Sequence, residues 1–147
     1  MKAFVLTQLK DLSENRSPLE LVECPFPSFG KKDIVVEVFI CGICRTELDE
    51  IEGRTPPSYF PIILGHQIVG RVIEKGQSVK KFNLGDRVGI AWVYSACGKC
   101  SYCREGRENL CAEFRATGRD ANGGYAEYTV VNEDFAFQLP SSISDEE

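Results

Sequence analysis

Short hydrophobic runs separated by turn residues dominate the chain, and most alternate with the two-residue period of β-strands. The run at residues 33–40 (DIVVEVFI) is rich in β-branched residues and predicts the strongest strand. Strands are predicted at residues 2–7, 19–23, 33–40, 68–74, 124–131 and 135–139, with one more at the end of segment 84–90. Many short strands with closely spaced turns predict a mainly β fold, either a barrel or a sandwich.

One short helix is predicted at residues 45–51. Leu48 and Ile51 lie three residues apart there and would share an apolar face, leaving a polar outer face. Gly53 follows and is suited to end the helix. No repeat or low-complexity tract interrupts the chain, so we expect one domain with one or two short helical pieces.

Four of the seven cysteines crowd into one short stretch, at Cys97, Cys100, Cys103 and Cys111. Glycines within the stretch allow tight turns, and the neighbouring lysine and arginines favour the thiolate form that metals bind. Four thiolates around one ion are the usual form of a structural zinc site. We therefore predict a zinc lobe at residues 95–113.

Three other states of these thiols compete with zinc. The bacterial ferredoxin run has three residues before its last cysteine and a proline after it, whereas this chain has seven residues and Ala112. Two disulfides would require an oxidising compartment. Burial as small apolar side chains does not suit so polar a segment. Zinc is the interpretation that fits the spacing best.

Composition limits the classes of partner. The chain has 147 residues, 43% hydrophobic and 27% charged, as is ordinary for a globular protein. Its net charge of -5 argues against a nucleic-acid or anionic-membrane partner. No segment resembles a signal peptide or a membrane span. Clustered cysteines in an odd number suit a reducing compartment, so a cytoplasmic location is expected.

A second group of candidate ligands lies earlier in the chain. His66 is the only histidine, and it sits between Gly65 and Gln67 just before a predicted strand. A lone histidine is more often structural than a ligand. Cys41 and Cys44 form a C-x-x-C, which is either a redox pair or one ligand and its buried neighbour. Spacing alone does not decide between these readings.

The order of motifs resembles the N-terminal GroES-like catalytic domain of the zinc-dependent medium-chain alcohol dehydrogenases. The resemblance covers nearly the whole chain. The matching stretches are CGICRTELDEIEG, LGHQIVGRVIEKG, LGDRVGIAW, CGKCSYCREGRENLC and GGYAEYTVV followed by FQLP. It implies a partly open GroES-like β-barrel carrying a four-cysteine zinc lobe, and oxidation of a small alcohol to an aldehyde or ketone with NAD or NADP.

The resemblance also implies roles for individual residues. The implied site comprises Cys97, Cys100, Cys103 and Cys111 for structural zinc, Cys44 and His66 for catalytic zinc, Arg45 for the cofactor pyrophosphate, Thr46 for proton transfer and Trp92 for the substrate pocket. Glu47 would orient a zinc-bound histidine. Bound zinc would act as a Lewis acid on the alcohol, and the nicotinamide would accept hydride. Under this reading Cys41 is a neighbour and not a redox partner.

The chain departs from the family at three side chains. Gln67 stands where many relatives have glutamate, so this group cannot supply a negative charge to the metal. Glu47 replaces the usual aspartate. Asp49 replaces a histidine that ends the proton relay in several relatives.

The larger departure is length. The family's third catalytic ligand, a cysteine beyond the last matching strand, does not appear within residues 1–147, and no G-x-G-x-x-G follows a strand. We expect an incomplete catalytic domain without its nucleotide-binding domain, a fragment that does not turn over alcohol by itself.

Two other functions compete with a portion of a dehydrogenase. One is a zinc-stabilised β-barrel that serves as a binding or assembly module and self-associates through exposed strand edges. The other is a thiol redox or zinc-buffering protein, which would need a low thiol pKa at Cys41 or Cys44.

Overall fold

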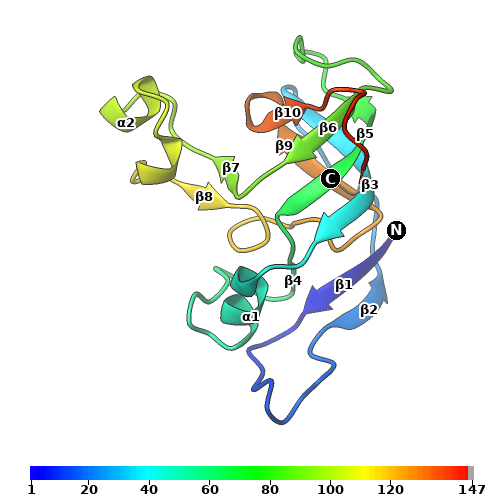
Figure 1. Cartoon of the computed structure of the whole chain (residues 1–147), viewed down its shortest axis with the longest axis vertical. Coiled ribbons are helices and arrows are strands. Elements are labelled where there is room, and N and C mark those ends of the chain that lie inside the picture. The colour runs from blue at the N-terminus through cyan, green and yellow to red at the C-terminus, as the bar shows by residue number, and fades with distance from the viewer. Residues whose placement is uncertain (146–147) are drawn as a thin grey trace.

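The computed structural model describes residues 1–145 and shows three antiparallel sheets with two short α-helices (Figure 1). The strands are β1 (Lys2–Leu6), β2 (Glu20–Glu23), β3 (Asp33–Gly42), β4 (Ile62–Ile63), β5 (Gln67–Lys75), β6 (Arg87–Ile90), β7 (Val93–Ser95), β8 (Arg115–Ala116), β9 (Tyr128–Asn132) and β10 (Ala136–Gln138). The helices are α1 (Arg45–Ile51), α2 (Ser101–Arg104) and the 3-10 turns η1 (Glu108–Leu110) and η2 (Glu133–Phe135). Neither α-helix in the described part of the chain has the length or apolar composition needed to cross a bilayer.

The largest sheet has the strand order β10-β6-β5-β3-β9 and curls into a partly open barrel. The β-branched run predicted as the strongest strand is β3, which pairs with β5 on one side and β9 on the other. Its fully buried side chains, such as Ile34 and Val36, pack with Ile68, Val72 and Val131 in the main core. The predicted mainly β fold with a partly open barrel is therefore confirmed.

A smaller sheet, β2-β1-β4, lies beside the barrel at the bottom of Figure 1. The run at residues 124–131 was expected to be one strand, but only its second half belongs to β9. Its first half crosses to β1, where Phe4 N–H donates to the carbonyl of Tyr125 and Ala3 pairs with Ala126. One hydrophobic run therefore joins two sheets, which an alternating pattern cannot reveal.

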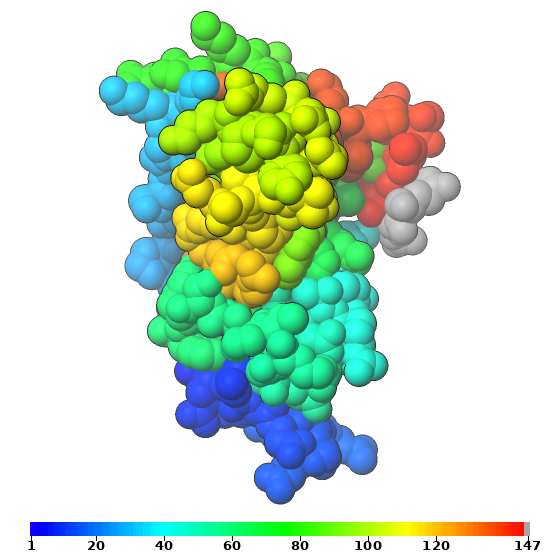
Figure 2. Space-filling model, turned by 90° about the vertical axis from the view of Figure 1, so that its left-hand side faces the viewer, coloured from blue at the N-terminus to red at the C-terminus, as the bar shows by residue number. Residues whose placement is uncertain are grey.

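The cysteine-rich segment projects from one side of the barrel on the β7-β8 hairpin (Figure 1). Figure 2 shows this lobe, in yellow-green and yellow, at the surface and facing the viewer. The two strands of the hairpin were not predicted, because three and two residues carry too little pattern to stand out. Within the lobe, Cys111 is the only fully buried side chain, so side-chain packing contributes little to its stability.

Candidate metal centres

The four cysteines of the lobe converge. The Sγ atoms of Cys97, Cys100, Cys103 and Cys111 all lie within 4.8 Å of one another, and none is in a disulfide. The Sγ of Cys103 lies 3.5 Å from that of Cys100 and 3.9 Å from that of Cys97. Zinc–sulfur bonds of about 2.3 Å at tetrahedral angles would separate two sulfurs by roughly 3.8 Å. The cage therefore fits one zinc ion.

Backbone amides around the lobe point at the sulfurs. The N–H of Cys100 donates to the Sγ of Cys97 at 3.4 Å, and the N–H of Glu113 donates to the Sγ of Cys111 at 3.3 Å. Backbone donors from Lys99 and Cys100 lower the pKa of the Cys97 thiol to about 6. These donors stabilise thiolate charge, as metal binding requires.

A second centre forms where α1 begins. Cys44 is the N-cap of α1, and its Sγ accepts a hydrogen bond from the N–H of Thr46 at 3.3 Å. The same Sγ lies 3.5 Å from Nε2 of His66, which is 93% buried. Zinc bonded to both atoms at tetrahedral angles would hold them roughly 3.6 Å apart. Two residues distant in sequence thus lie at a separation that would suit two ligands of one ion.

Glu47 connects the helix cap to the histidine. Its Oε2 accepts from the N–H of Cys44 at 2.8 Å, completing a capping box. Its Oε1 lies 2.7 Å from Nδ1 of His66, which leaves Nε2 facing Cys44. Burial acts to raise the pKa of the Glu47 carboxyl, but the hydrogen bonds from His66 and Cys44 outweigh it and hold this pKa below its usual value. This geometry is that of a carboxylate orienting a metal-bound histidine.

The loop carrying His66 is held by backbone contacts between glycines. Gly65 has φ of +95°, and Gly123 lies so close that an added Cβ would be 2.1 Å from the carbonyl oxygen of Gly65. A Cβ on Gly65 would be 2.7 Å from the Sγ of Cys41. Only hydrogen atoms fit between these segments, and this fixes the position of His66.

An apolar cavity of about 740 Å³ opens beside the histidine. His66, Gln67 and Trp92 line it together with apolar residues from β3, β5, β6 and β10. The rings of His66 and Trp92 meet edge to face, with centroids 4.8 Å apart. Trp92 lines this cavity, and its role in a substrate pocket stays a prediction.

Three predicted or noted residues lie on α1 away from this cavity. Arg45 is largely exposed and pairs with Asp49 at 3.3 Å, while Asp49 also binds Arg54 at 2.5 Å. Asp49 is therefore engaged by two arginines. Thr46 is half-buried and touches the centre through its backbone N–H only. The roles of Arg45 and Thr46 remain predictions.

The environment of Cys41 does not support the hypothesis that Cys41 and Cys44 form a redox pair. Its Sγ donates to the carbonyl of Gly42 at 3.7 Å, and burial raises its pKa to about 12. A thiol that stays protonated at neutral pH is a poor nucleophile. Cys41 is thus a half-buried neighbour of the centre.

The buried face of α1 differs from the predicted one. Glu47, Glu50 and Ile51 face the interior, whereas Leu48 is 38% exposed. The pairing of Leu48 with Ile51 was therefore wrong, because the capping box and the histidine draw Glu47 inward. Sequence reasoning also missed Arg119, whose guanidinium stacks on Trp92 at 5.5 Å. Arg119 belongs to no motif that would mark it as part of the site.

Glu50 is fully buried, and neither carboxylate oxygen has a hydrogen-bond partner among the described residues. Burial, and then the nearby charge of Glu47, raise its pKa to about 8 from an ordinary 4.5. The folded chain therefore binds one more proton than the unfolded chain between these pH values. Its stability should fall as the pH rises from about 4.5 to about 8.

Replacing Glu50 with glutamine should remove this penalty. We expect Glu50→Gln to increase the free energy of unfolding at pH 8 by roughly 2 to 4 kcal/mol and to change it little at pH 5. Urea titrations of the zinc-loaded protein at the two pH values measure this difference. Glu14→Gln, at an exposed loop position, is the matched control. Equal pH dependence in Glu50→Gln and the unaltered chain would contradict the burial argument.

Comparison with known proteins gives a consistent picture. Residues 30–141 match the family model described as the alcohol dehydrogenase GroES-like domain. A Mycobacterium tuberculosis protein named as a probable alcohol dehydrogenase is 49% identical over 135 residues, which is 88% of this chain and 39% of that protein. The chain therefore spans about two fifths of the length of this relative.

Two solved structures superpose closely on the fold. A zinc-binding dehydrogenase from Sinorhizobium meliloti, bound to NADP, matches with a TM-score of 0.84 and 33% identity, over 98% of this chain and 40% of that one. A thermostable alcohol dehydrogenase from Pyrobaculum aerophilum, with cobalt and zinc bound, matches with a TM-score of 0.85 and 28% identity, over 96% and 42%. In both cases the matched part is less than half of the larger protein.

Proposed function

Because this chain belongs to the alcohol dehydrogenase GroES-like domain family, we propose that it is the metal-holding catalytic portion of a zinc-dependent alcohol dehydrogenase. The reaction is oxidation of a small alcohol to an aldehyde or ketone with NAD or NADP. One observation carries the proposal, namely that Cys44 and His66 stand at zinc-ligand distance and that His66 also lines a mostly apolar cavity. A metal beside an apolar cavity suits a small alcohol with one polar end.

Each residue of the centre has a separate role in this proposal. Cys44 and His66 would hold the metal, and Glu47 fixes the ring of His66 through Nδ1 so that Nε2 stays free to ligate. Zinc, when bound, would supply a Lewis acid that makes an alcohol easier to deprotonate. The hydroxyl of Thr46, two residues after Cys44, can both donate and accept and would be the group that carries a proton outward. Arg45, exposed at the start of α1, meets the pyrophosphate of the cofactor.

Gln67 distinguishes this centre from those with glutamate after the histidine. It begins β5 opposite Gly42, and a Cβ on Gly42 would lie 2.5 Å from Oε1 of Gln67. The amide thus occupies the space that a side chain at position 42 would take. It adds no negative charge to the cavity, so we propose that Gln67 contacts substrate and does not act as a base or metal ligand.

The only tryptophan of the chain reports on this centre directly. Cobalt added to protein that carries zinc in its lobe should quench the fluorescence of Trp92, because the ion would bind next to the His66 ring. Benzyl alcohol added afterwards should change the emission again, saturably. Cys44→Ser and His66→Gln should each abolish both changes, and Cys24→Ser should leave them intact. Quenching that persists in both ligand variants would refute the proposed centre.

Turnover by the isolated chain should be absent. The sequence has no G-x-G-x-x-G to bind a dinucleotide, and only Cys44 and His66 match catalytic ligands of the family. We therefore expect NAD(P)H production from ethanol or benzyl alcohol to stay at the rate of a Cys44→Ser control. Detectable oxidation that the Cys44→Ser variant lacks would show that the chain suffices for catalysis.

An assembly module is the second candidate, and the smaller sheet favours it. Phe4 and Leu21 face each other across β1 and β2, and they are 47% and 60% exposed. β2 is also an edge strand within the described residues, so its outer backbone groups are free to pair with a second copy of the chain. Sedimentation should then show a dimer that Leu21→Lys dissociates. A monomer at all concentrations would remove this candidate.

A further inference from the structure

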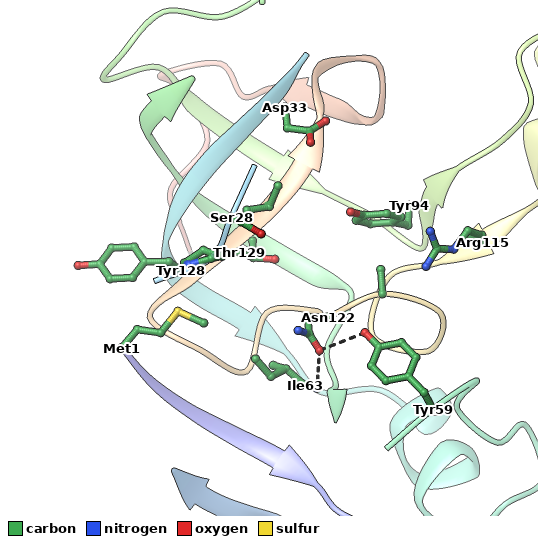
Figure 3. Close-up of a pocket in the computed structure, with 13 residues that line it drawn as sticks. Met1, Ser28, Asp33, Tyr59, Ile63, Tyr94, Arg115, Asn122, Tyr128 and Thr129 are labelled. Carbon is green, nitrogen blue, oxygen red and sulfur yellow. Dashed lines mark hydrogen bonds between the residues drawn. The ribbon is translucent and has the colours of Figure 1, made fainter. Parts of the chain in front are cut away.

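A second cavity, of about 370 Å³, lies between the β7-β8 hairpin and the barrel (Figure 3). It shares no lining residue with the cavity beside His66. Tyr94 of β7 and Arg115 of β8 face it from the hairpin, and Tyr59 and Asn122 face it from below in this view. Its lining is rich in hydrogen-bonding side chains, unlike the apolar cavity at the proposed metal centre.

Arg115 brings a positive charge that has no counter-ion among residues 1–145. No carboxylate of residues 1–145 lies within ion-pair distance of its guanidinium. One of its nitrogens donates to the carbonyl of Asp120, and the guanidinium lies 5.6 Å from the ring centroid of Tyr94. These two contacts hold the group at the cavity while most of its N–H donors stay available.

Other donors face the same space. The carbonyl oxygen of the Asn122 side chain accepts from Ile63 N–H at 3.1 Å and from the Tyr59 hydroxyl at 3.4 Å, so its amide nitrogen is left to donate (Figure 3). The Tyr94 hydroxyl has no hydrogen-bond partner in the described chain. Burial raises the pKa of Tyr94, so its hydroxyl keeps its proton at neutral pH.

The acid in the cavity wall does not neutralise this set. Asp33 lies at the far end from Tyr59 in Figure 3. Its Oδ2 accepts from Gly30 N–H at 2.8 Å, and its Oδ1 accepts from the side-chain amide of Asn132 at 3.3 Å. Both donors are neutral, so Asp33 keeps its negative charge, but it forms no ion pair with Arg115, and an anion would bind on the Arg115 side of the cavity.

We propose that this cavity binds a small anion through a carboxylate or phosphate group held by Arg115, the Tyr94 hydroxyl and the Asn122 amide. An arginine fork matches the paired oxygens of either group. The volume suits a molecule of metabolite size. The site does not depend on the proposed dehydrogenase function, since none of its residues belongs to either cysteine-containing centre.

Succinate and inorganic phosphate, titrated separately into zinc-loaded protein at constant ionic strength, test the site and distinguish its two chemistries. Nitrogen–proton correlation spectra should show a saturable shift of the Arg115 Nε–H signal with at least one of them. Succinamide, which is similar in shape and uncharged, should produce none. Arg115→Gln should weaken binding about tenfold or more, and Tyr94→Phe by a smaller factor.

Arg71→Gln is the matched control, because Arg71 also stacks on an aromatic ring, that of Phe39 at 5.2 Å, and lies outside this cavity. Its affinity should equal that of the unaltered chain. Arg115→Lys, which keeps the charge, should bind more weakly than the unaltered chain and more tightly than Arg115→Gln. Absence of a saturable shift with both anions, or equal weakening in Arg71→Gln and Arg115→Gln, would overturn the proposal.

Discussion

Cys103→Ser is expected to release the zinc of the four-cysteine lobe and to unfold that lobe while the barrel stays folded. The Sγ of Cys103 lies 3.9 Å from that of Cys97 and 3.5 Å from that of Cys100, and serine is a far weaker zinc ligand. Structural zinc sites bind with roughly 10 to 16 kcal/mol, so loss of one ligand in four should cost about 3 kcal/mol, or at least 100-fold in affinity.

The lobe is expected to unfold without the barrel because the hydrophobic core lies outside the lobe. None of the three clusters of buried apolar residues includes a residue of the lobe at 95–113. Metal ligation must therefore supply the stabilisation that side-chain packing does not give the lobe. Without zinc, the lobe should become the first site of proteolytic cleavage, and the strand signals of the barrel should persist.

Elemental analysis before and after mild chelation, followed by limited proteolysis, measures both effects. The unaltered chain should keep one zinc. Cys24→Ser, which changes a free cysteine outside both clusters, should behave identically. If Cys103→Ser still holds one zinc through chelation, the four-cysteine cage is not the tight site.

Glu47→Gln is expected to weaken metal binding at Cys44 and His66 by about 10- to 100-fold, the usual effect of losing the carboxylate behind a ligating histidine. Glutamine at the third helical position still accepts from the N–H of Cys44, so the capping box survives. Only the charged contact with Nδ1 of His66 changes. Metal affinity should fall while the stability of α1 stays nearly constant.

Two further variants separate orientation from folding. Glu47→Ala removes both contacts, and it should lower metal affinity and also destabilise the chain by about 1 to 2 kcal/mol. Glu47→Asp keeps the charge on a shorter arm and should recover part of the affinity. Cobalt titration followed by Trp92 emission, with a parallel urea titration, reads the two properties independently. Equal cobalt affinity in Glu47→Gln and the unaltered chain would show that Glu47 is a helix cap only.

Sequence spacing was sufficient to predict those features that depend on residues close together in the chain. The intervals among Cys97, Cys100, Cys103 and Cys111 predicted a cage that the fold assembles. The predicted bounds of the helix at 45–51 coincide with α1, and Gly53 follows its end with φ of +81°. Each of these features depends on residues close in sequence, where chain geometry leaves few alternatives.

Features that depend on distant contacts could not be predicted in this way. The convergence of Cys44 with His66 came from family resemblance, since 22 positions separate them and no period connects them. Glu50 occupies a helix position that spacing assigns to solvent, yet it is fully buried. Arg115 looks like any surface arginine until the fold shows that no carboxylate of residues 1–145 lies within ion-pair distance of its guanidinium. Such properties arise from tertiary packing, which one sequence does not display.

The glycine contact behind His66 also determines how the centre can be altered by directed evolution. Gly65, Gly118, Gly123 and Gly124 touch neighbouring atoms so closely that even a methyl group would collide. A library that randomises these positions would consist mostly of misfolded clones. Variation should instead enter at Ile40, Phe137 and Leu139, which line the cavity beside His66 from β3, from β10 and from the position just after β10. The unchanged glycine contacts would preserve metal binding while these three positions explore new substrates.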